Sequence, residues 1–131
     1  MTSHPLYSDQ VLDHFLSPRQ AGPLLAQDDS VVSGRAGSRH TGSILFFQFR
    51  LNGLQQIVDT RFRAYGCGAT IAVGSYVAST LLGHTADQAL ALKGVDIAQA
   101  LALEPVKLHC ALLAEDAIRS ALQHVIDFNQ E

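Results

Sequence analysis

The first apolar pattern along the chain has helical spacing. Phe15 follows Val11 by four residues and Leu12 by three, as on the buried face of an amphipathic helix. Ser8 is suited to cap the N-terminus of such a helix, and Pro18 marks its end. The pattern therefore predicts a helix over residues 8–16, followed by a loop over residues 20–30.

The pattern then changes to strict alternation, which is typical of strands. Residues 30–42 are rich in Gly and Ser and predict a strand that breaks into a flexible loop at 37–42. In the next strand one face carries the apolar residues Leu45, Phe47, Phe49 and Leu51. Asn52-Gly53 predicts a hairpin turn, because both residues tolerate positive φ. The return strand covers residues 55–65, and we expect one of its faces to hold Val58, Phe62 and Ala64.

The second half of the chain is helical in pattern. Small and apolar residues predict a helix over 67–82 that Gly83 closes, and the capping box of Thr85 and Gln88 opens a short helix. Further helices are expected over 96–101 and 109–128. Strands followed by helices indicate an α+β fold, with about three antiparallel strands covered by helices on one face. With 131 residues, we expect a single domain, 1–131.

Composition and charge exclude several classes of protein. The net charge is −3 and the nine basic residues are scattered, so an electrostatic nucleic-acid interface is not expected. No apolar run approaches the roughly 20 residues of a membrane span. The first residues do not resemble a secretory signal, so we expect a cytoplasmic protein. Two cysteines in such a chain do not make a disulfide framework.

The two cysteines share a predicted setting. Cys67 ends a strand and begins a helix between two glycines, and Cys110 lies in the first turn of the last predicted helix. A helix N-terminus stabilises a thiolate, the form that binds metal or attacks sulfur. Lys107 and His109 lie beside Cys110 as a counter-charge or ligand. Taken alone, each cysteine fits a buried thiol equally well, because no CxxC spacing is present. His40 is a further candidate, since it lies in the glycine-rich loop.

Several long segments, in order, resemble the NifU/IscU-type scaffold proteins of iron–sulfur cluster assembly. These segments are Tyr7–Phe15 with Pro18-Arg19, Arg61–Ala69, Pro105–Cys110 and Ala114–Ile118. The similarity covers nearly the whole chain and implies the α+β scaffold fold. It also implies that the two cysteines belong to one site for iron or a [2Fe–2S] cluster.

The chain departs from the resembled site at two positions. The family uses three cysteines and an aspartate, joined in some members by the histidine beside the last cysteine. The matching residues here are Cys67, Cys110 and His109, whereas Thr41 stands at the first cysteine and Ser43 at the aspartate. Hydroxyls are poor ligands for zinc or iron compared with thiolate, imidazole or carboxylate. Residues 103–107 lack the first proline of the segment that the family's Hsp70-type chaperone recognises, which weakens the case for that partner.

Three hypotheses follow from these observations. The first is a scaffold that binds iron, a [2Fe–2S] cluster or zinc through Cys67, Cys110 and His109, completed by His40 or by the cysteines of a second copy in a homodimer. The second is a thiol carrier in which Cys110 accepts persulfide sulfur from a cysteine desulfurase, or pairs with Cys67. The third is an interaction module that has lost its site. No Walker A or hydrolase motif is present, so we do not expect an enzyme.

Overall fold

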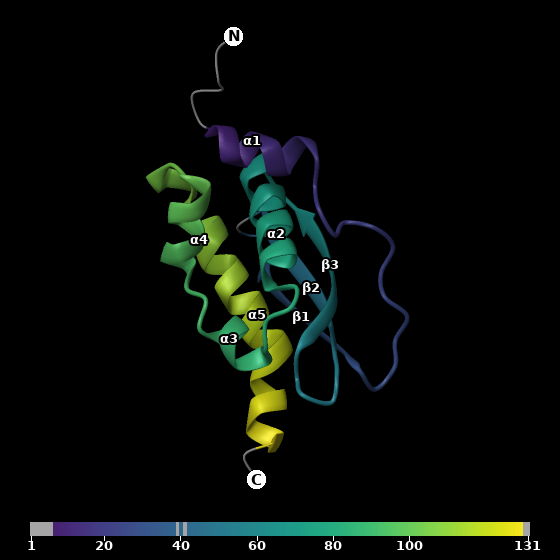
Figure 1. The fold of residues 1–131 in the computed structure, drawn as a ribbon. Helices are drawn as coiled ribbons and strands as arrows, with labels where there is room; N and C mark the ends of the chain where they lie inside the picture. Colours follow the sequence, from purple (N-terminus) through teal and green to yellow (C-terminus); the bar gives the residue numbers. More distant parts are fainter. Residues whose placement is uncertain (1–6, 39, 41, 130–131) are drawn as a thin grey trace.

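A computed structural model describes residues 7–38, 40 and 42–129, which form an α+β fold around a three-stranded sheet (Figure 1). The elements are α1 (Asp9–Leu16), β1 (Val31–Ser38), β2 (Ser43–Leu51), β3 (Ile57–Tyr65), α2 (Gly68–Leu81), α3 (Ala86–Leu90), α4 (Gly94–Leu101), the 3-10 turn η1 (Pro105–Lys107) and α5 (Leu108–Asn129). The fold class expected from the sequence is confirmed. None of the helices within the described residues is long and apolar enough to cross a membrane.

The sheet has the order β1-β2-β3 and is antiparallel throughout. The alternation of β2 places Leu45, Phe47 and Phe49 on one face, where all three are fully buried. This face packs against α2 and α5, with α5 lying over β1 and α2 over β3 (Figure 1). Where α5 crosses β1, Gly34 allows the two backbones to touch. A Cβ at Gly34 would lie 2.3 Å from the backbone nitrogen of Ala121.

The β2–β3 hairpin forms where Asn52-Gly53 predicted it, but its loop is longer than two residues. The Asn52 side-chain Oδ1 accepts hydrogen bonds from the backbone N–H groups of Leu54 and Gln56, at 2.9 and 3.0 Å. Positive φ occurs at Gln55 (61°) instead of at the Asn-Gly pair. Asn52 therefore acts through its side chain, as in an Asx turn.

The prediction that Val58 lies on the buried face of β3 was wrong. Val58 is 50% exposed, whereas Ile57 is fully buried. The register between β2 and β3 shifts at Arg50 and Leu51, and this bulge reverses the alternation at the start of β3. From Thr60 onward the pattern is regular, and Phe62 is buried as expected.

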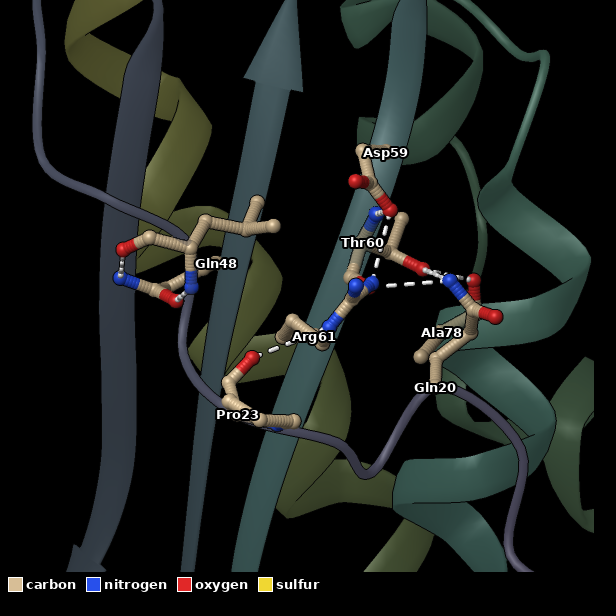
Figure 2. Close-up of polar contacts among 8 residues, drawn as sticks. Gln20, Pro23, Gln48, Asp59, Thr60, Arg61 and Ala78 are labelled. Atoms are coloured by element: carbon tan, nitrogen blue, oxygen red, sulfur yellow. Dashed lines mark hydrogen bonds and ion pairs between the residues drawn. The ribbon is translucent and has the colours of Figure 1, made fainter.

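Residues 18–30, which we call the strap, run from α1 along the free edge of β3 to the sheet face opposite the helices. Figure 2 shows how polar side chains hold the strap. The Gln20 side chain donates to the backbone oxygen of Thr60 at 3.0 Å, and Arg61 Nε donates to the backbone oxygen of Pro23 at 3.1 Å. The Gln48 amide is almost fully buried and bonds to both backbone polar groups of Leu25. The strap is thus an ordered part of the fold.

Candidate functional site

The site begins where β3 passes into α2. Gly66 adopts φ 143°, and a Cβ there would lie 2.9 Å from Ser43 Oγ, so this position requires glycine. Cys67 follows as the N-cap residue of α2, and its backbone oxygen accepts from Thr70 N–H at 3.0 Å. The half-buried Cys67 thiol therefore lies at the positive end of the α2 dipole.

The second thiol lies at the start of α5. The turn η1 leads directly into α5, and Cys110 is the third residue of that helix. Its side chain is fully buried in the core that the sheet and helices share. Both predicted helix starts are therefore confirmed, and both carry a free cysteine.

The two thiols meet at one hydroxyl group. Thr70 Oγ1 lies 3.6 Å from Cys67 Sγ and 3.4 Å from Cys110 Sγ, and it donates to Ser43 Oγ at 3.3 Å. Cys67 is also near enough to Cys110 to be among the groups that raise its pKa. Sequence reasoning did not identify Thr70. A signal was available, because residues i and i+3 share a helix face and Thr70 follows Cys67 by three positions.

A cation and an imidazole flank the thiols, as their positions in the sequence suggested. Lys107 Nζ donates to Cys67 Sγ at 3.6 Å, across the gap between η1 and α2. His109 Nε2 lies 3.6 Å from Cys110 Sγ, with its ring at the surface. The charged and titratable groups around the sulfurs therefore include one ammonium and one imidazole.

The environment shifts the pKa values of the two thiols in opposite directions. Burial raises the pKa of Cys67, but hydrogen bonds from the side chain and backbone of Thr70 and from the backbone of Ala69, together with the Lys107 charge, outweigh burial and lower this pKa to about 7. Burial also raises the pKa of Cys110; there the Thr70 hydroxyl opposes it only in part, and the neighbouring Cys67 raises the pKa further. At pH 7 about half of Cys67 is therefore thiolate, and Cys67 is the more acidic of the two thiols.

The remaining candidates lie on the β1–β2 connection. Ser43 is the first residue of β2, is 4% exposed, and its hydroxyl accepts the hydrogen bond from Thr70. We call the Ser43 hydroxyl the floor of the site. His40 is exposed in the turn before β2. Thr41 lies outside the described residues. Within residues 7–38, 40 and 42–129, no three or more His, Cys, Asp or Glu side chains are grouped so that they could hold a metal ion. The full ligand set therefore remains a prediction.

Comparison with known proteins supports the resemblance seen in the sequence. The family model of the NifU-like N terminal domain matches residues 6–130. The iron–sulfur cluster assembly scaffold protein IscU of Azotobacter vinelandii is 43% identical over 117 residues, which span 89% of this chain and 91% of the relative. The iron–sulfur cluster assembly protein 2 of Arabidopsis thaliana is 42% identical over 118 residues, which span 90% of this chain and 72% of the relative.

Solved structures show the same fold at lower sequence identity. A crystal structure of a putative iron–sulfur cluster assembly scaffold protein for the SUF system, from Fervidobacterium islandicum, superposes with a TM-score of 0.71 at 18% identity, covering 92% of this chain and 99% of the other. The N-terminal part of a NifU-like protein from Brucella abortus gives a TM-score of 0.72 at 20% identity, with coverage of 93% and 95%. The chain belongs to the family of the NifU-like N-terminal domain.

Proposed function

We propose that this protein is a scaffold for iron–sulfur cluster assembly, which carries iron or a cluster as cargo on Cys67, Cys110 and His109. The observation that carries the proposal is the convergence of the two thiols on Thr70 Oγ1, at 3.6 and 3.4 Å. Relatives at about 43% identity are named as scaffolds of this assembly. Thiolates are the ligands that hold iron–sulfur clusters in proteins.

The donor set of one chain fits this cargo in part. Two sulfurs and one imidazole are soft or borderline donors, as iron, zinc and clusters prefer. A [2Fe–2S] cluster or a structural zinc ion takes four protein ligands. The missing ligands must therefore come from elsewhere, and the cysteines of a second copy supply two more thiolates of the required kind. His40, which is exposed in its turn, is the alternative within one chain.

The quantity that tests this proposal is metal and acid-labile sulfide per chain, in protein purified without oxygen. Equal iron and sulfide with charge-transfer absorption bands supports a cluster, and one [2Fe–2S] cluster per two chains supports the shared site. Zinc alone indicates a Cys/His site for a single ion. No metal or cluster after reconstitution with ferrous iron and sulfide overturns the scaffold proposal.

Transfer of sulfur to this site is a second function, and the acidity of the thiols favours Cys67 as acceptor over Cys110. Cys67 is half-buried with a pKa of about 7, whereas Cys110 is fully buried with a raised pKa. In this reaction the Cys67 thiolate attacks the outer sulfur of a cysteine desulfurase persulfide. The new S–S bond forms as the old one breaks, and the desulfurase thiolate leaves.

Mass spectrometry after incubation with a cysteine desulfurase and cysteine separates the two acceptors. We expect one added sulfur on Cys67. Sulfur on Cys110 alone requires that α5 open at its N-terminus, and it restores the assignment that the resemblance favours. If both thiols stay unmodified while metal is also absent, the chain is an interaction module, and a Cys67→Ala/Cys110→Ala variant then keeps its partners.

A further inference from the structure

We infer that Cys67 and Cys110 form a complete site for a soft monovalent metal ion, copper(I), although they form only part of a site for a cluster. The inference rests on the proposed function only in that both use the same two thiols. Copper(I) has a filled d shell, accepts two or three ligands and prefers thiolate sulfur. The chain brings two sulfurs together beside one shared hydroxyl, with the His109 imidazole 3.6 Å from Cys110.

The charge balance of the two thiolates and Lys107 favours a monovalent cation. Two thiolates carry two negative charges, and the Lys107 ammonium, 3.6 Å from Cys67 Sγ, offsets one of them. A monovalent ion makes the assembly neutral, whereas a divalent ion leaves a positive charge beside the fully buried Cys110. Because an uncompensated charge is costly in a buried position, the monovalent ion is favoured.

Among the described residues, no Asp or Glu is grouped with the two cysteines, so the site has no charged oxygen donor there. Ser43 is 4% exposed, and its hydroxyl accepts from Thr70. Ions such as zinc and ferrous iron use a carboxylate where one is present, but a neutral hydroxyl is a weak ligand for them. A copper(I) ion loses nothing by this replacement, because it needs only the sulfurs.

Binding requires no change of oxidation state. Each thiol releases its proton to water as its sulfur binds, and copper enters and remains as copper(I). Because both thiols are then used, a chain that holds copper cannot carry iron or a cluster on them. Copper(I) therefore competes with cluster loading on this protein.

The test is anaerobic titration of the metal-free protein with copper(I), in competition with a chromophoric copper(I) chelator. We expect one ion per chain, protection of both thiols from alkylation, and X-ray absorption showing copper bound to two sulfurs. The Cys67→Ala/Cys110→Ala variant should lose at least about a hundredfold in affinity, whereas Lys107→Gln should lose only about two- to fivefold, because Lys107 is partly exposed. Wild-type affinity no greater than that of the double variant, or copper bound to four sulfurs, overturns the inference.

A second variant tests the role of the floor. Ser43→Asp adds a carboxylate, and we expect it to raise zinc affinity about tenfold relative to copper(I), with Ser43→Thr as the control that keeps a hydroxyl. If copper-loaded wild type still takes up a cluster, the competition is wrong. Copper binding without any cluster uptake by the copper-free protein overturns the scaffold proposal alone. Cluster uptake without copper binding overturns only the present inference.

Discussion

At the scale of single residues, the site depends on which neighbour receives the hydrogen bond from the Thr70 hydroxyl. Its hydroxyl donates to Ser43 and contacts both sulfurs, yet a hydroxyl has only one hydrogen to give. While both thiols are protonated they can donate to the Thr70 lone pairs. Once Cys67 ionises, the Thr70 proton is better placed on the thiolate, because hydrogen bonds to charged groups are stronger. Thr70 therefore links the acidity of Cys67 to the floor of the site.

The first prediction is that the thiols of the metal-free protein differ in their reaction with iodoacetamide. Because the thiolate is the reactive form, the rate at Cys67 should rise with pH around a midpoint near 7, which is its pKa. Cys110, which is buried and has a raised pKa, should react far more slowly at every pH below its own midpoint. Timed alkylation with peptide mass spectrometry measures both rates. Equal rates would contradict the opposite shifts.

The matched variants for this prediction are at Thr70. Thr70→Val keeps the shape but removes the hydroxyl, so the Cys67 midpoint should move to higher pH and the rate at pH 7 should fall severalfold. Thr70→Ser keeps the hydroxyl and should behave more like the wild type. If the valine variant retains a midpoint near 7, Lys107 and the helix backbone stabilise the thiolate without Thr70.

The residues of the site differ in how far the sequence revealed them. Cys67 and Cys110 were found because strand and helix patterns placed both at helix starts, and His109 and Lys107 were found as neighbours in the chain. Thr70 was missed although its i, i+3 spacing from Cys67 was a local signal, whereas its bond to Ser43 joins the start of β2 to the first turn of α2. No local pattern specifies such a tertiary contact.

At the scale of elements, the close approach of β1 to α5 leads to the second prediction. Gly34→Ala places a methyl group 2.3 Å from the backbone of Ala121, and backbone cannot move aside as a side chain can. We expect the free energy of unfolding to fall by about 1–3 kcal/mol or more. Gly53→Ala is the control, because nothing lies within 4 Å of its Cβ and its change should stay within about 0.5 kcal/mol. Urea unfolding measures both, and similar losses would refute the tight packing.

The third prediction concerns the strap. Gln48→Leu removes the amide that bonds Leu25 N–H at 2.7 Å, and leaves that backbone group without its partner. The bond is only partly buried and water can reach the freed N–H group, so the variant should lose about 0.5–1.5 kcal/mol of stability. Hydrogen exchange at Leu25 should accelerate as well. Gln99→Leu, at an exposed position of α4, serves as the control. Unchanged exchange at Leu25 would show that Arg61 and Gln20 hold the strap alone.

The elements themselves were largely predictable, and their faces less so. The helix over 8–16, the hairpin at Asn52 and the capping box at Thr85 follow from local chemistry, and the structure has all three. The burial of Ile57 instead of Val58 was not predictable, because the bulge that causes it depends on how β3 pairs with β2. The strap was predicted only as a loop, since the burial of Gln48 arises when the strap crosses the sheet.

At the scale of the whole molecule, the chain keeps the fold of the family, and the resemblance implies that its site has fewer ligands. The chain is 43% identical to a scaffold protein over 89% of its length, and its helix starts still bring two thiols together. The resemblance places Thr41 and Ser43 where a cysteine and an aspartate belong. The resemblance therefore implies fewer charged ligands in this site, a difference that substitution can reverse.

The fourth prediction follows from that count. Thr41→Cys/Ser43→Asp gives one chain three thiols, a carboxylate and His109, which is enough for four-coordinate iron. After anaerobic reconstitution, the variant should lose its cluster to a chelator at least about tenfold more slowly than the wild type. Thr41→Ser/Ser43→Thr controls for substitution without added ligands, and circular dichroism checks the fold. The decay of the charge-transfer absorption band measures the rate.

The contradicting outcome is a variant that binds one cluster per chain but loses it as fast as the wild type does. The number of ligands would then not limit how firmly the site holds its cluster. The burial of Cys110 must then restrict access, and the cargo enters only when the start of α5 moves away from Thr70.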